Sequence, residues 1–188
     1  MKFKLNPAFD AASGALSKLV FREVNGKTIV SRKPSTNGEI TEAQAAHRVR
    51  FRQAAAYGKF AMANPDTRAF YQASSEGKDA PAFALCVADF LNLPSIKDVD
   101  LSAYHGQPGD TIKLITSDDF GVVNVHVVIA NALGTTLESG NAVEAPAGTG
   151  RWTYAATAAV ADGTTVTVKV TATDRPGGVA TSTTTQGI

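Results

Sequence analysis

Histidines are the side chains of this sequence best suited to acid–base or metal chemistry, but their spacing favours neither. His47, His105 and His126 lie far apart in the chain, and none belongs to an H-x-x-x-H or H-E-x-x-H pattern, which would place two imidazoles on one helical face. The sequence also contains no G-x-S-x-G nucleophile elbow and no P-loop for phosphate. We therefore expect a protein that is not an enzyme and has no bound cofactor.

Aspartates are the second group with a chemistry to consider. Four of them flank expected strands: Asp110, Asp118, Asp119 and Asp174. They could gather at one end of a β-sandwich and bind Ca²⁺ through their carboxylate oxygens. However, Asp118-Asp119 also suits an ordinary turn before a strand, and Asp174 suits the turn at Arg175-Pro-Gly-Gly178. We prefer the turns, and the sequence predicts no metal ligand.

Basic residues could instead bind nucleic acid. Arg48, Arg50, Arg52 and Lys59 place positive charge on one expected helix. However, the alanines between them and Phe51 are typical of packing rather than of base stacking. A solvated face or a contact between subunits is the preferred interpretation, and we expect no nucleic-acid partner.

Composition excludes several further classes. The single cysteine, Cys86, rules out an intramolecular disulfide, and its place in the apolar run Phe83–Leu93 predicts a buried thiol. No run approaches the roughly 18 apolar residues of a membrane span. The first ten residues lack the apolar core of a secretory signal. We expect an extracellular assembly, a cell-surface protein or a virion component that is exported without such a signal; a cytoplasmic location is the alternative.

Charge is divided unevenly along the chain, although the net charge is only +1. Residues 1–94 carry thirteen Lys/Arg and eight Asp/Glu, whereas residues 95–188 carry five and nine. A positive end and a negative end on one molecule favour head-to-tail contacts between copies.

The clearest local signal is a β-hairpin at residues 19–32. Two apolar-rich segments flank Asn25-Gly26, a pair that favours the type I′ turn of a two-residue hairpin loop. This turn pairs Val24 with Lys27 and Phe21 with Val30. Apolar side chains then lie on both faces: Leu19, Phe21 and Val30 on one, and Val20, Val24 and Ile29 on the other. An isolated hairpin cannot bury two faces, so this chain's own helices or a neighbouring subunit must cover it.

Three helices are expected after a loop at residues 33–38. The first begins at the capping box Thr41-Glu-Ala-Gln44, and its apolar stripe contains Ala45, Val49, Ala56, Phe60 and Ala63. Asn64-Pro65 ends it and starts a second helix at about residues 67–75. A third helix is expected at about residues 80–93.

Threonine and valine alternate after Ile96, which predicts half-buried strands. Seven short strands in about ninety residues indicate a β-sandwich. The fold class is therefore α+β, with a hairpin and helical module at 1–94 and an antiparallel sandwich at 95–188. The expected strands are Val99–Tyr104, Thr111–Thr116, Val122–Asn131, Leu137–Ala142, Arg151–Thr157, Thr164–Thr173 and Val179–Thr184.

Motifs in the second half resemble bacterial immunoglobulin-like domains, of the Big or fibronectin III-like kind. These are Gly150-Arg-Trp-Thr-Tyr154, Gly163-Thr-Thr-Val-Thr-Val-Lys-Val170 and Thr171-Ala-Thr-Asp-Arg-Pro-Gly177. The resemblance covers about residues 99–188 and implies an immunoglobulin-like sandwich with a core tryptophan. It carries no function, because such domains serve adhesion, spacing and assembly alike.

The first half is similar to N-terminal regions of uncharacterised bacterial and prophage-encoded proteins. The shared pattern is Val20-Phe-Arg, Asn25-Gly-Lys, Val30 and Lys33-Pro, followed by Thr41-x-Ala-Gln and a helix rich in Arg, Phe and Ala. This resemblance implies an assembly component and no particular functional residue.

Together these features predict a non-catalytic subunit that self-associates in a filament, sheath, virion or surface layer. The expected acidic partners of its arginines in another copy are Asp98, Asp100 and Asp118. The alternative is an adhesin-like module that binds carbohydrate or a host protein through exposed Tyr104 and Tyr154, with Trp152 more suited to the core. The predicted assembly interface consists of Leu19, Val20, Phe21, Arg22, Val24, Ile29, Val30, Arg32, Arg48 and Arg52.

Overall fold

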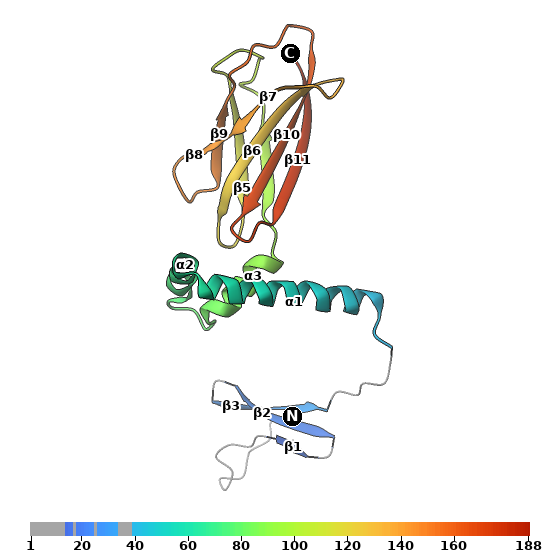
Figure 1. Cartoon of the computed structure of the whole chain (residues 1–188), viewed down its shortest axis with the longest axis vertical. Coiled ribbons are helices and arrows are strands. Elements are labelled where there is room, and N and C mark those ends of the chain that lie inside the picture. The colour runs from blue at the N-terminus through green and yellow to red at the C-terminus, as the bar shows by residue number, and fades with distance from the viewer. Residues whose placement is uncertain (1–13, 17, 25, 34–38) are drawn as a thin grey trace. The chain divides into compact units, whose positions relative to one another are not determined.

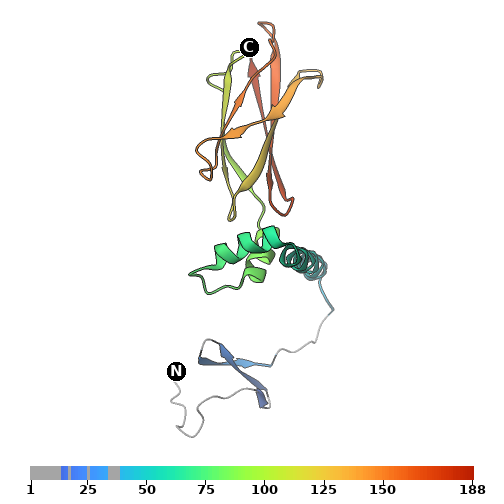
Figure 2. The same ribbon diagram turned by 60° about the vertical axis from the view of Figure 1, so that its left-hand side comes forward.

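A computed structural model describes residues 14–16, 18–24, 26–33 and 39–188. It divides into two compact units, Met1–Glu42 and Ala43–Ile188. The predicted boundary at residue 94 falls inside the second unit, between its helices and its strands. Figures 1 and 2 show the two units.

The first unit contains a three-stranded antiparallel sheet in the order β1-β2-β3. Its strands are β1 (Gly14–Leu16), β2 (Leu19–Val24) and β3 (Lys27–Arg32). The hairpin register is confirmed, because Val24 pairs with Lys27 and Phe21 with Val30. Gly26 has a φ of +70°, as a type I′ turn requires, and Asn25 lies outside the described residues. Strand β1 was not predicted, and residues 34–38 of the expected loop also lie outside the description.

Helices α1 (Glu42–Ala63), α2 (Pro65–Ser75) and α3 (Ala82–Leu91) open the second unit. The predicted stop and restart is confirmed at Asn64, whose side-chain oxygen accepts hydrogen bonds from the backbone of Asp66 and Thr67. Pro65 occupies the first turn, where its missing N–H costs nothing. Helix α1 begins directly after Thr41, as the capping box predicts.

The apolar stripe predicted for α1 is not the face that this unit buries. Ala45, Val49, Ala56, Phe60 and Ala63 are all exposed. The buried face instead consists of the small residues Ala54, Gly58 and Ala61. A Cβ on Gly58 would lie 2.8 Å from the Phe83 ring, so glycine permits the close approach of α3. The predicted stripe is wrong because an alanine-rich helix has more than one face that could be buried.

Two four-stranded antiparallel sheets follow, in the orders β4-β5-β9-β8 and β11-β10-β6-β7. Figure 1 shows them stacked as a sandwich. The α+β class is confirmed at this level. The strands are β4 (Ser95–Asp100), β5 (Thr111–Ser117), β6 (Val122–Asn131), β7 (Thr136–Asn141), β8 (Val143–Glu144), β9 (Arg151–Ala155), β10 (Thr165–Asp174) and β11 (Val179–Gly187).

The sandwich core has the predicted alternation. Val125, Val127 and Ile129 of β6 are fully buried, as is the set Val166, Val168, Val170 and Ala172 of β10. The first expected strand was misplaced, since β4 ends at Asp100. Leu101 and Tyr104 are buried but belong to a turn, in which the Tyr104 N–H donates to the Leu101 carbonyl. Their burial gave the segment the apolar pattern of a strand.

The helices of the second unit pack against one end of the sandwich, formed by the β5–β6 and β10–β11 turns (Figures 1 and 2). The Tyr71 ring of α2 meets Phe120 of the first turn edge to face, at 5.7 Å between centroids. The Arg175 guanidinium of the second turn lies 3.9 Å from the centre of the Phe70 ring. Among the described residues, no helix is long and apolar enough to cross a membrane.

Candidate functional site

The predicted interface residues of the hairpin lie on both faces of the sheet β1–β3. The register places Leu19, Phe21 and Val30 on one face, and Val20, Val24 and Ile29 on the other. Four of the six are exposed at 40–51% of their surface, and Val20 and Phe21 are half-buried.

The predicted interface arginines are also exposed. Their three expected acidic partners differ from one another in burial and in surroundings. Arg22 and Arg32 lie on β2 and β3, and Arg48 and Arg52 on the first half of α1. Asp98 is exposed on β4, and Asp100 beside it is half-buried. Asp118 lies in a different environment, a group of three aspartates, and is therefore not a free partner for arginines of another copy.

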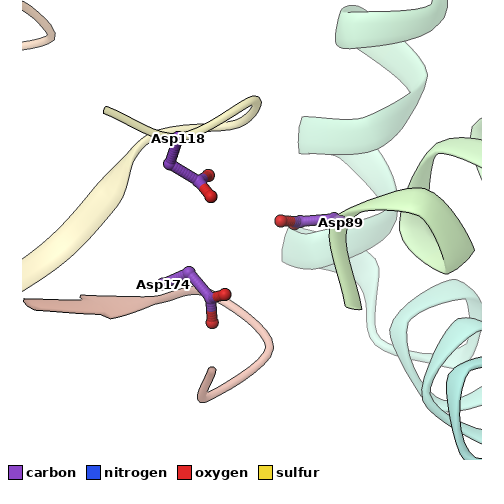
Figure 3. Close-up of side chains that lie close together, drawn as sticks. All are labelled: Asp89, Asp118 and Asp174. Carbon is purple, nitrogen blue, oxygen red and sulfur yellow. The ribbon is translucent and has the colours of Figure 1, made fainter. Parts of the chain in front are cut away.

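The three aspartates meet where the helices join the sandwich. Asp89 comes from α3, Asp118 from the β5–β6 turn and Asp174 from the end of β10. One carboxylate oxygen of each lies within 4.8 Å of the others, and Figure 3 shows the three carboxylates directed toward the same space. Asp89 and Asp174 are only 0% and 2% exposed. In the described part of the chain, these are the side chains that could together hold a metal ion.

Each carboxylate has one oxygen held by a donor and one without a hydrogen-bond partner in the described structure. Asp118 Oδ2 accepts the Phe120 N–H at 2.9 Å, and Asp174 Oδ1 accepts the Gly178 N–H at 2.5 Å. Asp89 Oδ2 accepts a short hydrogen bond from the Tyr71 hydroxyl. The other three oxygens, Asp89 Oδ1, Asp118 Oδ1 and Asp174 Oδ2, are buried and unpaired. The donors thus orient the three carboxylates.

Burial raises the pKa of the Asp89 carboxyl to about 6, because the ionised form loses its hydration. The hydrogen bond from Tyr71 lowers this pKa, the charges of Asp118 and Asp174 raise it, and the Arg175 cation lowers it. Burial also raises the pKa of Asp174. Three carboxylates this close are mutually repulsive unless a proton or a cation compensates them.

Without divalent cations, we expect the protein to be more stable at pH 5 than at pH 7. A carboxyl whose pKa rises on folding, from 3.8 to about 6 for Asp89, gives its full stabilisation below pH 3.8 and loses it as pH rises through 6. The expected difference between pH 5 and pH 7 is about 1 kcal/mol. Urea denaturation in a chelator would measure it, and Asp89→Asn should reduce it, because the raised pKa of Asp174 contributes a pH dependence of the same sign. An identical pH dependence in both proteins would exclude Asp89 as its source.

The other aspartates considered for calcium do not join this group. Asp110 caps a turn, where its carboxylate accepts the N–H groups of His105 and Gln107 at 2.7 and 2.9 Å. These bonds lower its pKa. Asp119 accepts the Asn92 side-chain amide at 2.6 Å. Asp110 and Asp119 are therefore held by other partners, while Asp118 and Asp174 gather with Asp89.

Asp89 was not among the aspartates considered as calcium ligands from the sequence, because it lies within an apolar helical run. Its neighbours Leu85, Cys86 and Val87 are all buried, and burial raises the Cys86 pKa to about 11. A lone carboxylate on such a helix is unfavourable unless something compensates it, and that is the signal that could have identified it. Its hydrogen-bond donor Tyr71 is fully buried and also bonds the Tyr57 hydroxyl at 3.0 Å.

Comparisons with known proteins gave one weak likeness. Neither the protein-family models nor the curated proteins contained a match. Among solved structures, CopC from Methylosinus trichosporium OB3b matched 50% of this chain and 89% of its own, with 17% identity and a TM-score of 0.37. A likeness at this TM-score supports no inference about function.

Proposed function

We propose that this protein is a non-catalytic structural subunit that self-associates into a larger assembly, such as a filament, sheath, virion or surface layer, and displays an immunoglobulin-like sandwich. The observation that carries this proposal is the exposure of large apolar side chains on both faces of the sheet β1–β3. Leu19, Val24, Ile29 and Val30 are exposed at 40%, 48%, 48% and 51% of their surface. Apolar surface of this kind is stabilised by contact with another protein.

A second copy is the occupant that the sheet favours. Within the described residues, the sheet has the order β1-β2-β3, so β1 and β3 are its edge strands, and outer backbone groups of an edge strand can pair with a strand of another chain. Pairing along the β3 edge would extend the sheet and place the apolar faces of two copies side by side. The same contact would shelter Ile29 and Val30, which alternate between the faces.

Charge favours contact between unlike parts of two copies. Residues 1–42 carry seven Lys/Arg and four Asp/Glu, and residues 43–188 carry eleven and thirteen. The first unit is therefore positive and the second negative, which supports head-to-tail association. Exposed Arg22 and Arg32 on the sheet, with Asp98 on β4, are the proposed ion-pair partners.

Helix α1 adds a further apolar surface to the proposal. Val49 and Phe60 of the sequence-predicted stripe are 49% and 67% exposed, and residues 42–53 are exposed throughout. Arg48 and Arg52 lie on the same segment. Contact with another copy would bury this stripe together with the apolar stems of the arginines.

The immunoglobulin-like part of the proposal is supported by strand order. Assigning β4, β5, β9 and β8 to strands A, B, E and D, and β6, β10 and β11 to C, F and G, reproduces the two sheets of such domains, with β7 as a further strand beside β6. Burial of Trp152 in this core agrees with the resemblance. The aromatic contacts suggested for an adhesin are less available, because Tyr104 and Tyr154 are buried as well.

Self-association is tested by sedimentation velocity over a range of concentrations at low salt. We expect the wild-type protein to form oligomers whose size grows with concentration. Ile29→Asp and Val30→Asp alter opposite faces of the sheet, and each should weaken association at least tenfold, or about 1.4 kcal/mol, if its face is sheltered in the contact.

Val143→Asp is the matched control, because Val143 is an exposed strand valine of the sandwich, at 68% of its surface. This variant should associate like the wild type, with circular dichroism confirming that all variants are folded. A wild-type protein that remains monomeric at high concentration and low salt would exclude the assembly. Equal weakening by the control would show that the sheet is not the contact.

A further inference from the structure

We propose that Asp89, Asp118 and Asp174 bind one Ca²⁺ ion, which ties helix α3 to the end of the sandwich. This proposal is independent of self-association, because all three ligands belong to the unit Ala43–Ile188 of a single chain. It departs from the sequence-based expectation, which favoured turns and predicted no metal ligand.

The unpaired oxygens are the first argument for a cation. Asp89 and Asp174 are almost completely buried, yet each has one oxygen without a hydrogen-bond partner in the described structure, and so does Asp118. A buried carboxylate oxygen without a donor is unfavourable, so native structures normally provide a donor or a metal ion. The three carboxylates are directed toward one space (Figure 3), where a single cation could contact an oxygen of each.

Distances agree with a shared ion. Ca²⁺ binds oxygen at about 2.3–2.6 Å, so two ligands on opposite sides of one ion lie at most about 5 Å apart. Here the ligand oxygens of the three aspartates lie within 4.8 Å of one another. The side chains thus need little rearrangement to contact the same ion.

The ligand set favours Ca²⁺ over other common cations. All three ligands are carboxylates, which suit hard ions, whereas structural Zn²⁺ sites use mainly cysteine and histidine. Mg²⁺ retains several waters in a strict octahedron, which is difficult between two carboxylates that are themselves buried. Ca²⁺ accepts irregular geometry and bidentate carboxylates, and this freedom suits ligands from a helix, a turn and a strand end.

Gly178 preserves the space around Asp174. Its N–H holds Oδ1 of Asp174, and a Cβ on residue 178 would overlap both the free Oδ2 and the side chain of Leu93. Phe120 and Tyr71 hold Asp118 and Asp89 in the same way, each by one oxygen. The site is therefore oriented before any ion binds, which reduces the entropy lost on binding.

The expected consequence is a rigid joint. Described contacts between helices and sandwich include the Asn92–Asp119 hydrogen bond, the Tyr71–Phe120 ring contact and Arg175 over Phe70. Repulsion among the three carboxylates opposes these contacts. A bound divalent cation would neutralise this repulsion and connect helix α3 to the sandwich through shared ligands. Calcium would then fix the direction in which the sandwich projects from the helices.

The experiment is thermal unfolding of the full chain, treated with a chelator and then titrated with CaCl₂ or MgCl₂. We expect saturating CaCl₂ to raise the unfolding midpoint by about 5 °C or more, with a smaller shift from MgCl₂. Isothermal titration calorimetry should give one Ca²⁺ per chain. No shift and no heat at millimolar CaCl₂ would overturn the proposal. A larger shift with MgCl₂ would overturn the choice of calcium.

Two conservative variants and a matched control separate ligand loss from general damage. Asp89→Asn and Asp118→Asn should each abolish the CaCl₂ shift, and Asp89→Asn should unfold at a higher temperature than the metal-free wild type because one buried charge is gone. Asp162→Asn makes the same change at an exposed loop position and should retain the full shift. A normal shift in both cluster variants, or its loss in the control, would contradict the assignment.

Discussion

Replacing Trp152 with alanine is expected to lower the free energy of unfolding by about 3–5 kcal/mol. Trp152 lies on β9, is 7% exposed and packs in the core between the two sheets. Its indole N–H donates to the Thr116 hydroxyl at 3.0 Å, so alanine leaves both a cavity and an unpaired buried hydroxyl. Urea denaturation followed by far-ultraviolet circular dichroism measures the loss without relying on tryptophan fluorescence.

Trp152→Phe is the matched variant, because it keeps an aromatic ring and removes the N–H donor. Its free energy of unfolding should exceed that of the alanine variant by about 1–3 kcal/mol, because the phenylalanine ring fills most of the cavity. A cost below about 1 kcal/mol for Trp152→Ala would show that the sandwich core does not depend on this residue. Equal costs for both variants would place the whole effect in the hydrogen bond to Thr116.

The sandwich was the most predictable part of the fold, because alternation of side chains between core and solvent is a local property. Val125, Val127 and Ile129 report their burial by their spacing, and β6 was predicted at its observed bounds. The hairpin register followed from Asn25-Gly26 for the same reason. β4 was misplaced because Leu101 and Tyr104 reach the core from a turn, which no period-two pattern describes.

Helix α1 shows where sequence periodicity becomes insufficient. A stripe of larger apolar residues, such as Val49 and Phe60, was predicted to face the core, but this unit buries Ala54, Gly58 and Ala61. Which stripe is buried depends on how closely α3 approaches, and α3 is distant in sequence. Only a three-dimensional contact, here Phe83 against Gly58, decides between the two.

The aspartate group could be predicted only in part. Asp118 directly follows β5 and Asp174 is the last residue of β10, and both strands finish at the same end of the sandwich, so the sequence could have predicted that these two residues lie close together. The contribution of Asp89 depends on packing of α3 against that edge, which no local pattern encodes. Aspartate also occurs both in turns and as a metal ligand, so the residue type does not distinguish the two roles. The difference lies in whether the second carboxylate oxygen accepts a hydrogen bond, and in these three aspartates it does not.

The second large effect is expected at Gly150, where alanine should lower the free energy of unfolding by at least about 3 kcal/mol. Gly150 has a φ of +69°, and a Cβ there would overlap the carbonyl oxygen of Thr116. The two residues are already joined, since the Thr116 N–H donates to the Gly150 carbonyl at 2.8 Å. The backbone of one strand end must therefore move, and a backbone shift is more costly than a side-chain rotation.

Gly148→Ala is the control that isolates this overlap. Gly148 has a similar φ of +76°, but nothing lies within 4 Å of a Cβ placed there. It should therefore show only the strain of a left-handed backbone, about 1–2 kcal/mol. Chemical denaturation of the two variants under the same conditions measures the difference. Equal losses would mean that the approach to Thr116 is unimportant.

Gly150→Ala should also alter the positions of the three clustered aspartates. Thr116 lies two residues before Asp118, so displacing the end of β5 moves a proposed calcium ligand. We expect Gly150→Ala to reduce the CaCl₂ shift of the unfolding midpoint at least twofold and Gly148→Ala to leave it unchanged, because the ion requires its three ligands within about 5 Å of one another. A full shift in folded Gly150→Ala would show that Asp118 is positioned independently of Thr116.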